Sequence, residues 1–161
     1  MAIKTGTIQV DATASSQYYL RLDWSQDSYD IASNTSQVSV KFYVGRYSPY
    51  AGSAWSNSAS ENRSTVSDGT TTKSWSGTFD TRPSHNNISQ IGAHTFTVAH
   101  DSNGTKTINF TASFTADSAG SLTGTSTLKG SALLTPIPRA VTFTATNFDI
   151  GQPLVLNAVN P

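Results

Sequence analysis

Aromatic side chains with hydroxyl and amide neighbours are concentrated in one short stretch of the chain. Tyr43, Tyr47, Tyr50 and Trp55 lie within thirteen residues, among several Ser and Asn. Aromatic rings offer large, rigid contact surfaces at a low cost in side-chain entropy, and Ser and Asn add adaptable hydrogen bonds. A sugar ring has an apolar C–H face and a rim of hydroxyls. This stretch therefore favours contact with a saccharide.

The predicted ligand contacts are Tyr47, Tyr50 and Trp55, with Arg46 and Asn57 as polar partners. Tyr18 and Tyr19, at the start of an alternating segment, could join the same platform. Two alternatives stay open at this point. The rings could pack a long loop onto the rest of the domain, or they could contact another protein.

Residues for catalysis are sparse. His94 and His100 lie six residues apart, so on one strand they would point to the same side, about 20 Å from each other. That separation is too large for a shared metal. The single glutamate, Glu61, has no partner acid placed by spacing, whereas a glycosidase needs two carboxyl groups across a cleft. We expect no enzyme activity, no cofactor and no metal site; a glycan depolymerase is the enzymatic alternative.

The composition excludes several classes of partner. Ten Lys and Arg balance ten Asp and Glu, giving a formal net charge of 0 over 161 residues. Nucleic-acid binding and adhesion to anionic membranes both need clustered basic residues, so we expect neither. Ser, Thr and Asn together make 57 of the 161 residues and keep the surface polar without charge. The chain has no cysteine, which excludes a disulfide framework.

Apolar residues alternate with polar ones along most of the chain. Leu20, Leu22 and Trp24 form one such series, and we assign Trp24 and Trp75 to the core. A period of two indicates strands with one face in a core and one face in water. The expected strands lie near 4–11, 18–25, 37–45, 72–79, 94–99, 106–115, 121–129 and 141–147, with a further short strand possible near 61–66. Eight such strands predict an all-β, antiparallel β-sandwich resembling a jelly roll.

Two segments punctuate this pattern. Asp101-Ser102-Asn103-Gly104 predicts a tight turn that folds one strand back on the next. It lacks the following acid that a calcium loop requires. Further on, Pro136 and Pro138 cannot both lie in a central strand, so they predict an extended connector. We therefore expect a β-sandwich module over 1–138. Residues 139–161 would be a connector leading into a docking strand pair or the start of a second β module.

Two motifs resemble segments of known phage proteins. His100-Asp101-Ser102-Asn103-Gly104-Thr105-Lys106 resembles a turn common in bacteriophage virion proteins. Leu134-Thr135-Pro136-Ile137-Pro138-Arg139-Ala140 resembles the segment that closes the N-terminal β-module of siphophage minor structural proteins. These are long tail-tip, tail-fibre or receptor-binding proteins of phages that infect Gram-positive bacteria. The order and spacing of the two motifs carry the resemblance.

The resemblance implies a β-sandwich on the extracellular phage particle, serving host adhesion or recognition of a cell-wall polysaccharide. The family supplies no catalytic residue to carry over. Implied partners are the host polysaccharide and other virion proteins, with a homo-oligomer left open. A purely structural role in the tail, neck or capsid decoration is the main alternative.

Overall fold

The molecule consists of two four-stranded antiparallel sheets. The computed structural model describes residues 2–13, 15–47, 56–116, 122 and 124–139, with 56–61 described by their backbone alone. Sheet A has the order β1-β2-β3-β6, and sheet B has the order β5-β4-β7-β8. The strands of sheet A are β1 (Lys4–Ala12), β2 (Ser15–Asp30), β3 (Thr35–Arg46) and β6 (Ile88–Ala99). Those of sheet B are β4 (Ser56–Ser67), β5 (Thr72–Asp80), β7 (Thr107–Ala116) and β8 (Gly124–Leu133).

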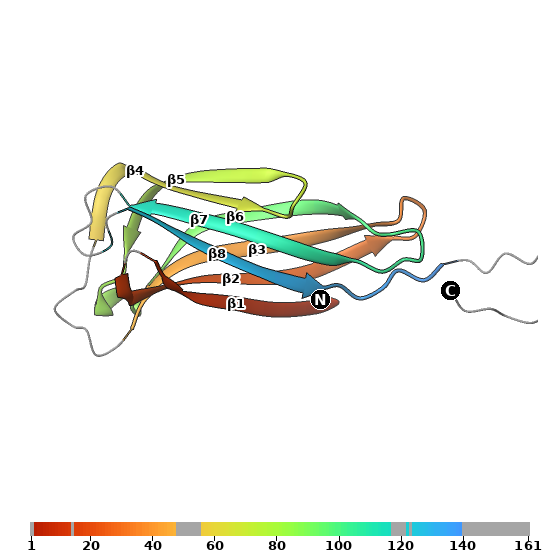
Figure 1. Cartoon of the computed structure of the whole chain (residues 1–161), viewed down its shortest axis with the longest axis horizontal. Helices are drawn as coiled ribbons and strands as arrows, with labels where there is room; N and C mark the ends of the chain where they lie inside the picture. Colours follow the sequence, from red (N-terminus) through yellow and green to blue (C-terminus); the bar gives the residue numbers. More distant parts are fainter. Residues whose placement is uncertain (1, 14, 48–55, 117–121, 123, 140–161) are drawn as a thin grey trace, which may run out of the picture.

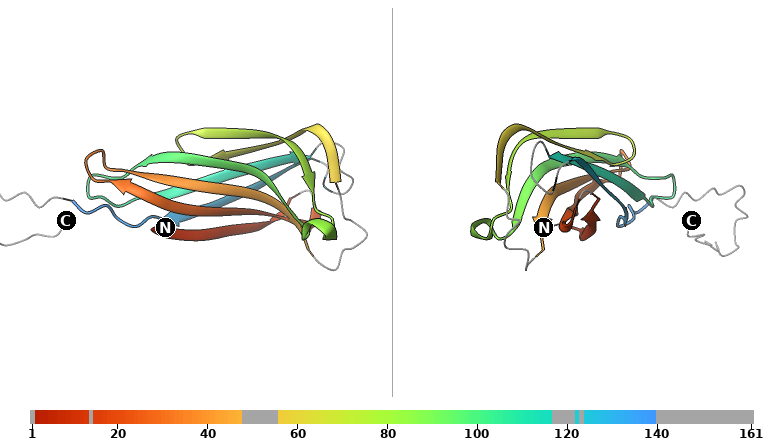
Figure 2. Two further views of the ribbon diagram at one scale, coloured as in Figure 1. Left: turned by 180° about the vertical axis from the view of Figure 1, so that it is seen from behind. Right: turned by 60° about the vertical axis from the view of Figure 1, so that its left-hand side comes forward.

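The two sheets form an elongated body whose strands run mostly lengthwise (Figures 1 and 2). One short 3₁₀ helix, η2 (Pro83–His85), lies between β5 and β6. Within the described residues no helix is long and apolar enough to span a bilayer. The predicted all-β sandwich is confirmed.

Alternation along the strands builds the core between the sheets. In β2, Leu20, Leu22 and Trp24 are buried, and so are Phe110 and Phe114 of β7. The intervening residues of each strand are more exposed. The assignment of Trp24 to the core is confirmed, while Trp75 of β5 is half-buried and packs against the core's edge.

Most predicted strands are present, and the differences are local. β2 runs far beyond 18–25 at both ends, and β6 begins six residues before the predicted 94. The short strand expected as possible near 61–66 is part of a longer strand, β4, which runs from Ser56 to Ser67. Two of its inward positions are polar, which hides the period: Asn62 donates to the carbonyl of Gly77, and Ser64 donates to that of Ile91. The predicted strand at 141–147 lies outside the described residues.

The turn at Asp101–Gly104 forms, but the expectation that it folds one strand onto its neighbour is wrong. β6 belongs to sheet A and β7 to sheet B, so the turn crosses between the layers. Its bonds are the Gly104 amide to the Asp101 carbonyl and the Asp101 amide to the Thr105 carbonyl. Beyond the turn, β7 pairs with β4 and β8, and not with β6.

The proline-containing connector lies against this same turn. The Leu134 amide donates to Lys106, and the Ile137 amide donates to Gly104, so the connector pairs through its non-proline residues. Ile137 is buried, whereas both prolines are exposed. The extended connector predicted from Pro136 and Pro138 is thus present, packed onto the sandwich as an additional edge segment.

A chain of buried polar groups holds the connector to sheet A. The side chain of Gln26 donates to the Thr135 carbonyl and accepts from the Thr135 amide, at 3.2 and 2.8 Å. It also donates to the Ser36 hydroxyl at 2.9 Å. The His100 ring lies 2.8 Å from that hydroxyl through Nε2, and its Nδ1 lies 2.7 Å from the Gly104 carbonyl. Because a carbonyl only accepts, Nδ1 carries a proton, and in the neutral ring Nε2 then accepts from the Ser36 hydroxyl.

Gly104 is closely packed against the connector. Its φ is +82°, and a Cβ there would lie 2.2 Å from the Ile137 carbonyl oxygen.

We expect Gly104→Ala to lower the free energy of unfolding by about 2–4 kcal/mol, from backbone strain plus overpacking. Chemical denaturation measures it. Gly124→Ala is the matched control, because φ is +103° there with nothing within 4 Å of the added Cβ. It should lose only about 1–2 kcal/mol. Equal losses in the two variants would contradict the packing role of Gly104.

His94 occupies the side of the sandwich where β6 faces β4 and β5. It pairs with the inward residue Val40 of β3, and its Nε2 is buried with no hydrogen-bond partner among the described residues. Burial lowers the pKa of His94 below its ordinary value of 6.5, and the positive charge of Lys73 on β5 lowers it further. The folded protein therefore favours the neutral ring.

The stability of the protein should consequently depend on pH near neutrality. Because the pKa of His94 is lower in the folded chain, the unfolded chain binds the proton more readily. The free energy of unfolding therefore keeps its full value above about pH 7 and decreases as the pH drops below 6.5. His94→Gln should flatten this fall in denaturation curves between pH 7.5 and 5.5. His85→Gln, at an exposed histidine, is the control. An unchanged pH dependence in His94→Gln would contradict the assignment.

Candidate functional site

The outward side of sheet A is the surface on which polar and aromatic side chains gather. It is formed by the residues of β1, β2 and β3 that alternate with the core positions; we call it the outer face. The register places Thr7 beside Asp23 and Asp23 beside Lys41, with Arg21 beside Tyr43. Directly opposed side chains on antiparallel strands lie about 5 Å apart, so these groups form one continuous surface.

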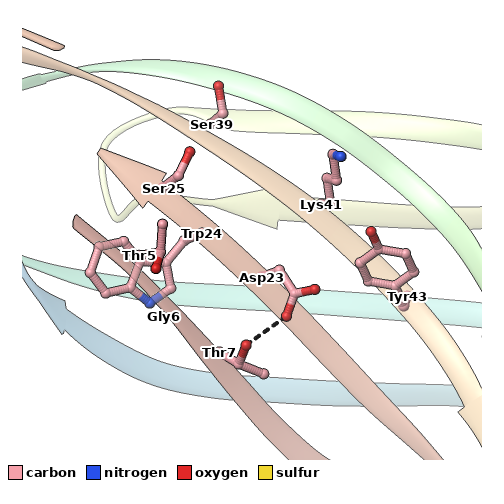
Figure 3. Close-up of a pocket in the computed structure, with 9 residues that line it drawn as sticks. All are labelled: Thr5, Gly6, Thr7, Asp23, Trp24, Ser25, Ser39, Lys41 and Tyr43. Atoms are coloured by element: carbon pink, nitrogen blue, oxygen red, sulfur yellow. Dashed lines mark hydrogen bonds between the residues drawn. The ribbon is translucent and has the colours of Figure 1, made fainter. Parts of the chain in front are cut away.

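A shallow hollow lies in the middle of the outer face. Its volume is about 370 Å³, and three strands contribute to it (Figure 3). The lining residues are Thr5, Gly6, Thr7, Asp23, Trp24, Ser25, Ser39, Lys41 and Tyr43. Gly6 and Trp24 are paired inward positions at the edge of this hollow. A Cβ on Gly6 would lie 2.6 Å from the indole nitrogen of Trp24, so only glycine leaves room for the ring.

Asp23 is the best-connected polar group of the hollow. Its carboxylate accepts from Arg21 at 2.5 and 2.9 Å and from the Thr7 hydroxyl at 2.7 Å. The hydrogen bonds from Arg21 hold the pKa of Asp23 below its ordinary value, aided by Thr7 and by the charge of Lys41. Asp23 therefore stays ionised at neutral pH as a preoriented acceptor. Figure 3 shows its carboxylate between Thr7 and Tyr43.

Aromatic rings occupy two places on the outer face. The Arg21 guanidinium lies 5.4 Å from the centre of the Tyr43 ring, within cation–π range. Tyr19 and Tyr47 form a tilted pair with ring centres 5.0 Å apart. The Tyr47 hydroxyl donates to Asp11 at 2.7 Å, and this bond raises the pKa of Tyr47. Tyr47 thus stays protonated, with its ring fixed at the end of the sheet.

The predicted ligand contacts divide between this surface and other places. Tyr47 lies on the outer face, as does Tyr43 of the aromatic cluster. Arg46 is buried, donating to the Asn87 side chain at 2.5 Å, and this bond ties β3 to the segment before β6. Its alternation with Tyr47 explains why it points inward. A ligand-binding role for Arg46 stays a prediction.

For the other predicted ligand contacts the structure gives little or no side-chain information. Tyr50 and Trp55 lie outside the described residues. Asn57 is placed in β4 opposite Phe79, by its backbone alone. Of the two tyrosines expected to join the platform, Tyr19 does so beside Tyr47, whereas Tyr18 is fully buried in the core.

Several outer-face residues were absent from the predicted site. Arg21, Asp23 and Lys41 alternate with core residues along β2 and β3. The available signal was their polarity combined with the alternation of the two strands. What the sequence does not give is the pairing of β2 with β3, which brings Arg21 beside Tyr43.

The fold and this surface together define a small antiparallel β-sandwich module with one open polar and aromatic sheet face. The chain belongs to the family described as "Siphovirus protein of unknown function (DUF859)", whose model matches residues 12–160. The comparisons with curated proteins and with solved structures found no match. The siphophage part of the resemblance is confirmed, and the match extends across the proline connector. The tail-tip position and the Gram-positive host stay predictions.

Proposed function

We propose that this chain is a non-enzymatic module of the siphovirus particle, on the tail or another surface appendage, that binds a saccharide of the host cell wall. The observation that carries the proposal is the outer face of sheet A. There an ionised acceptor, a hydroxyl-lined hollow and half-buried tyrosine rings share one surface. This combination suits a sugar, which offers an apolar C–H face and a rim of hydroxyls.

The charges of the outer face also suit a neutral, hydroxyl-rich ligand. Arg21 and Asp23 already neutralise each other through two hydrogen bonds. The binding site is shallow, so each copy would bind weakly. Many copies on one particle would raise the overall avidity without any new contact.

A structural role in the particle is the second candidate. Large apolar side chains are exposed near one end of the sandwich, where β1 begins, β2 ends and β8 ends (Figure 1). They are Ile3, Tyr29, Ile31 and Leu133. Exposed apolar groups close to the connector are compatible with contacts to neighbouring subunits.

Cell binding by the fluorescently tagged chain separates the two candidates. The chain should label intact Gram-positive cells of a host strain, and stripping the surface polysaccharide should abolish the label. Tyr43→Ala should weaken binding about threefold to tenfold, the effect of losing one aromatic contact. Tyr29→Ala removes an exposed tyrosine at the far end of β2 and should leave binding unchanged. If the chain labels no strain and light scattering shows an oligomer of the size of a closed ring, the structural role is favoured.

A further inference from the structure

The aromatic groups of the outer face form two separate contact sites, which we call stations. The first is the Tyr19–Tyr47 pair, and the second is Tyr43. Tyr19 lies opposite Gly45, and Arg21 lies opposite Tyr43, which is two residues before Gly45 in β3. Tyr19 and Tyr43 are therefore diagonal neighbours, which in antiparallel sheets lie about 7–8 Å apart. Tyr47 extends the first station beyond the end of β3. Two stations at this spacing suit two different rings of one ligand.

Gly45 keeps the surface between the stations flat. A Cβ at Gly45 would lie 2.1 Å from the Tyr19 ring, so the ring lies directly over the β3 backbone. Any larger residue at 45 would raise or displace Tyr19. The path from Tyr47 to Tyr43 thus has no side chain standing across it on β3.

Hydrogen-bonding groups continue along the same path. From Gly45 the outward positions of β3 are Tyr43, Lys41 and Ser39. Six residues of strand span about 20 Å, which exceeds one sugar ring. At the far end, Ser25 and Ser39 both donate to Asp27, and these bonds lower the pKa of Asp27. Fixed acceptors and hydroxyls therefore continue the surface beyond Tyr43 toward the far end of β3.

The hollow is a depression on a sheet face and not a cavity between the sheets. Its lining comes mostly from the outward residues of three strands, together with the paired inward positions Gly6 and Trp24. A pocket for a small molecule or a chain end encloses most of its ligand. An open face of this length lets a polymer enter and leave at both ends.

Resting on the function proposed above, we propose that the outer face holds an internal stretch of a linear polysaccharide along β3. Tyr43 and the Tyr19–Tyr47 pair contact different sugar rings of that stretch. Asp23, which lies beside Lys41 on the side of Tyr43 away from Tyr19, accepts hydroxyls of the next sugar along, and the Arg21 bonds hold its carboxylate in place. The ligand class is a hydroxyl-rich chain without dense charge.

Calorimetry with size-fractionated fragments tests this. The probes are fragments of the wall polysaccharide from a strain that the chain labels. Affinity should rise with fragment length over the first few sugars and then level off. Reducing the terminal sugar to its alditol should leave the affinity of long fragments unchanged. Tyr43→Ala and Tyr47→Ala should each weaken long fragments about threefold to tenfold. Tyr29→Ala is the control, and circular dichroism verifies folding.

The outcomes distinguish this inference from the proposed function. Monosaccharides binding as tightly as long fragments, or alditol reduction abolishing binding, would overturn the internal-stretch assignment while leaving saccharide binding intact. No binding of any fragment would overturn both. Gly45→Ala offers an independent arm, because it moves Tyr19 without removing a ligand-binding group. It should weaken long fragments and leave single sugars unaffected.

Discussion

Strict two-residue alternation along β2 and β3 is the constraint on which the rest of the structure depends. It buries Leu22 and Phe42, which lie opposite each other in the register, and turns Arg21 and Tyr43 outward as the next pair. A slip of one residue in either strand would exchange the two sets. The buried pairs therefore fix the register, and the register in turn sets the geometry of the outer face. The core and the candidate site are two consequences of one pairing.

Buried hydrogen bonds hold the structure together where the connector meets the Asp101–Gly104 turn. Gln26, Ser36 and His100 come from three segments and are each buried and hydrogen-bonded. Leaving any one of these groups unpaired would cost about 1–3 kcal/mol. Both motifs that suggested a phage protein meet here, since Ile137 pairs with Gly104. Those motifs thus have a structural task, which is to fix the direction in which the chain leaves the sandwich.

The sequence predicted the layers well and their connections poorly. Thr- and Val-rich alternation identified most strands, because one wet face and one dry face leave a clear period. β4 was obscured because Asn62 and Ser64 face inward and are satisfied by backbone carbonyls. Sheet membership of β6 and β7 could not be predicted, since a tight turn can join strands within a sheet or between sheets.

The candidate site was predicted in part for the same reason. Tyr43 and Tyr47 drew attention through their density in the sequence. Arg21 and Asp23 lie some twenty residues earlier and join them only through the pairing of β2 with β3. Alternation alone would have turned Arg46 inward, between the outward positions of Gly45 and Tyr47. Cluster density in a sequence thus locates a region, and strand register decides which of its residues share a surface.

The most direct test of the saccharide-binding face is a chemical-shift map. Soluble wall polysaccharide from a host strain is titrated into the ¹⁵N-labelled chain, and amide shifts are followed residue by residue. We expect the perturbed amides to cluster on β1, β2 and β3 around Thr7, Asp23 and Tyr43. Amides of Ser113 and Thr127, a register pair in sheet B, should stay unperturbed. Shifts centred on sheet B, or on the end that carries Ile31 and Leu133, would contradict the assignment of the outer face.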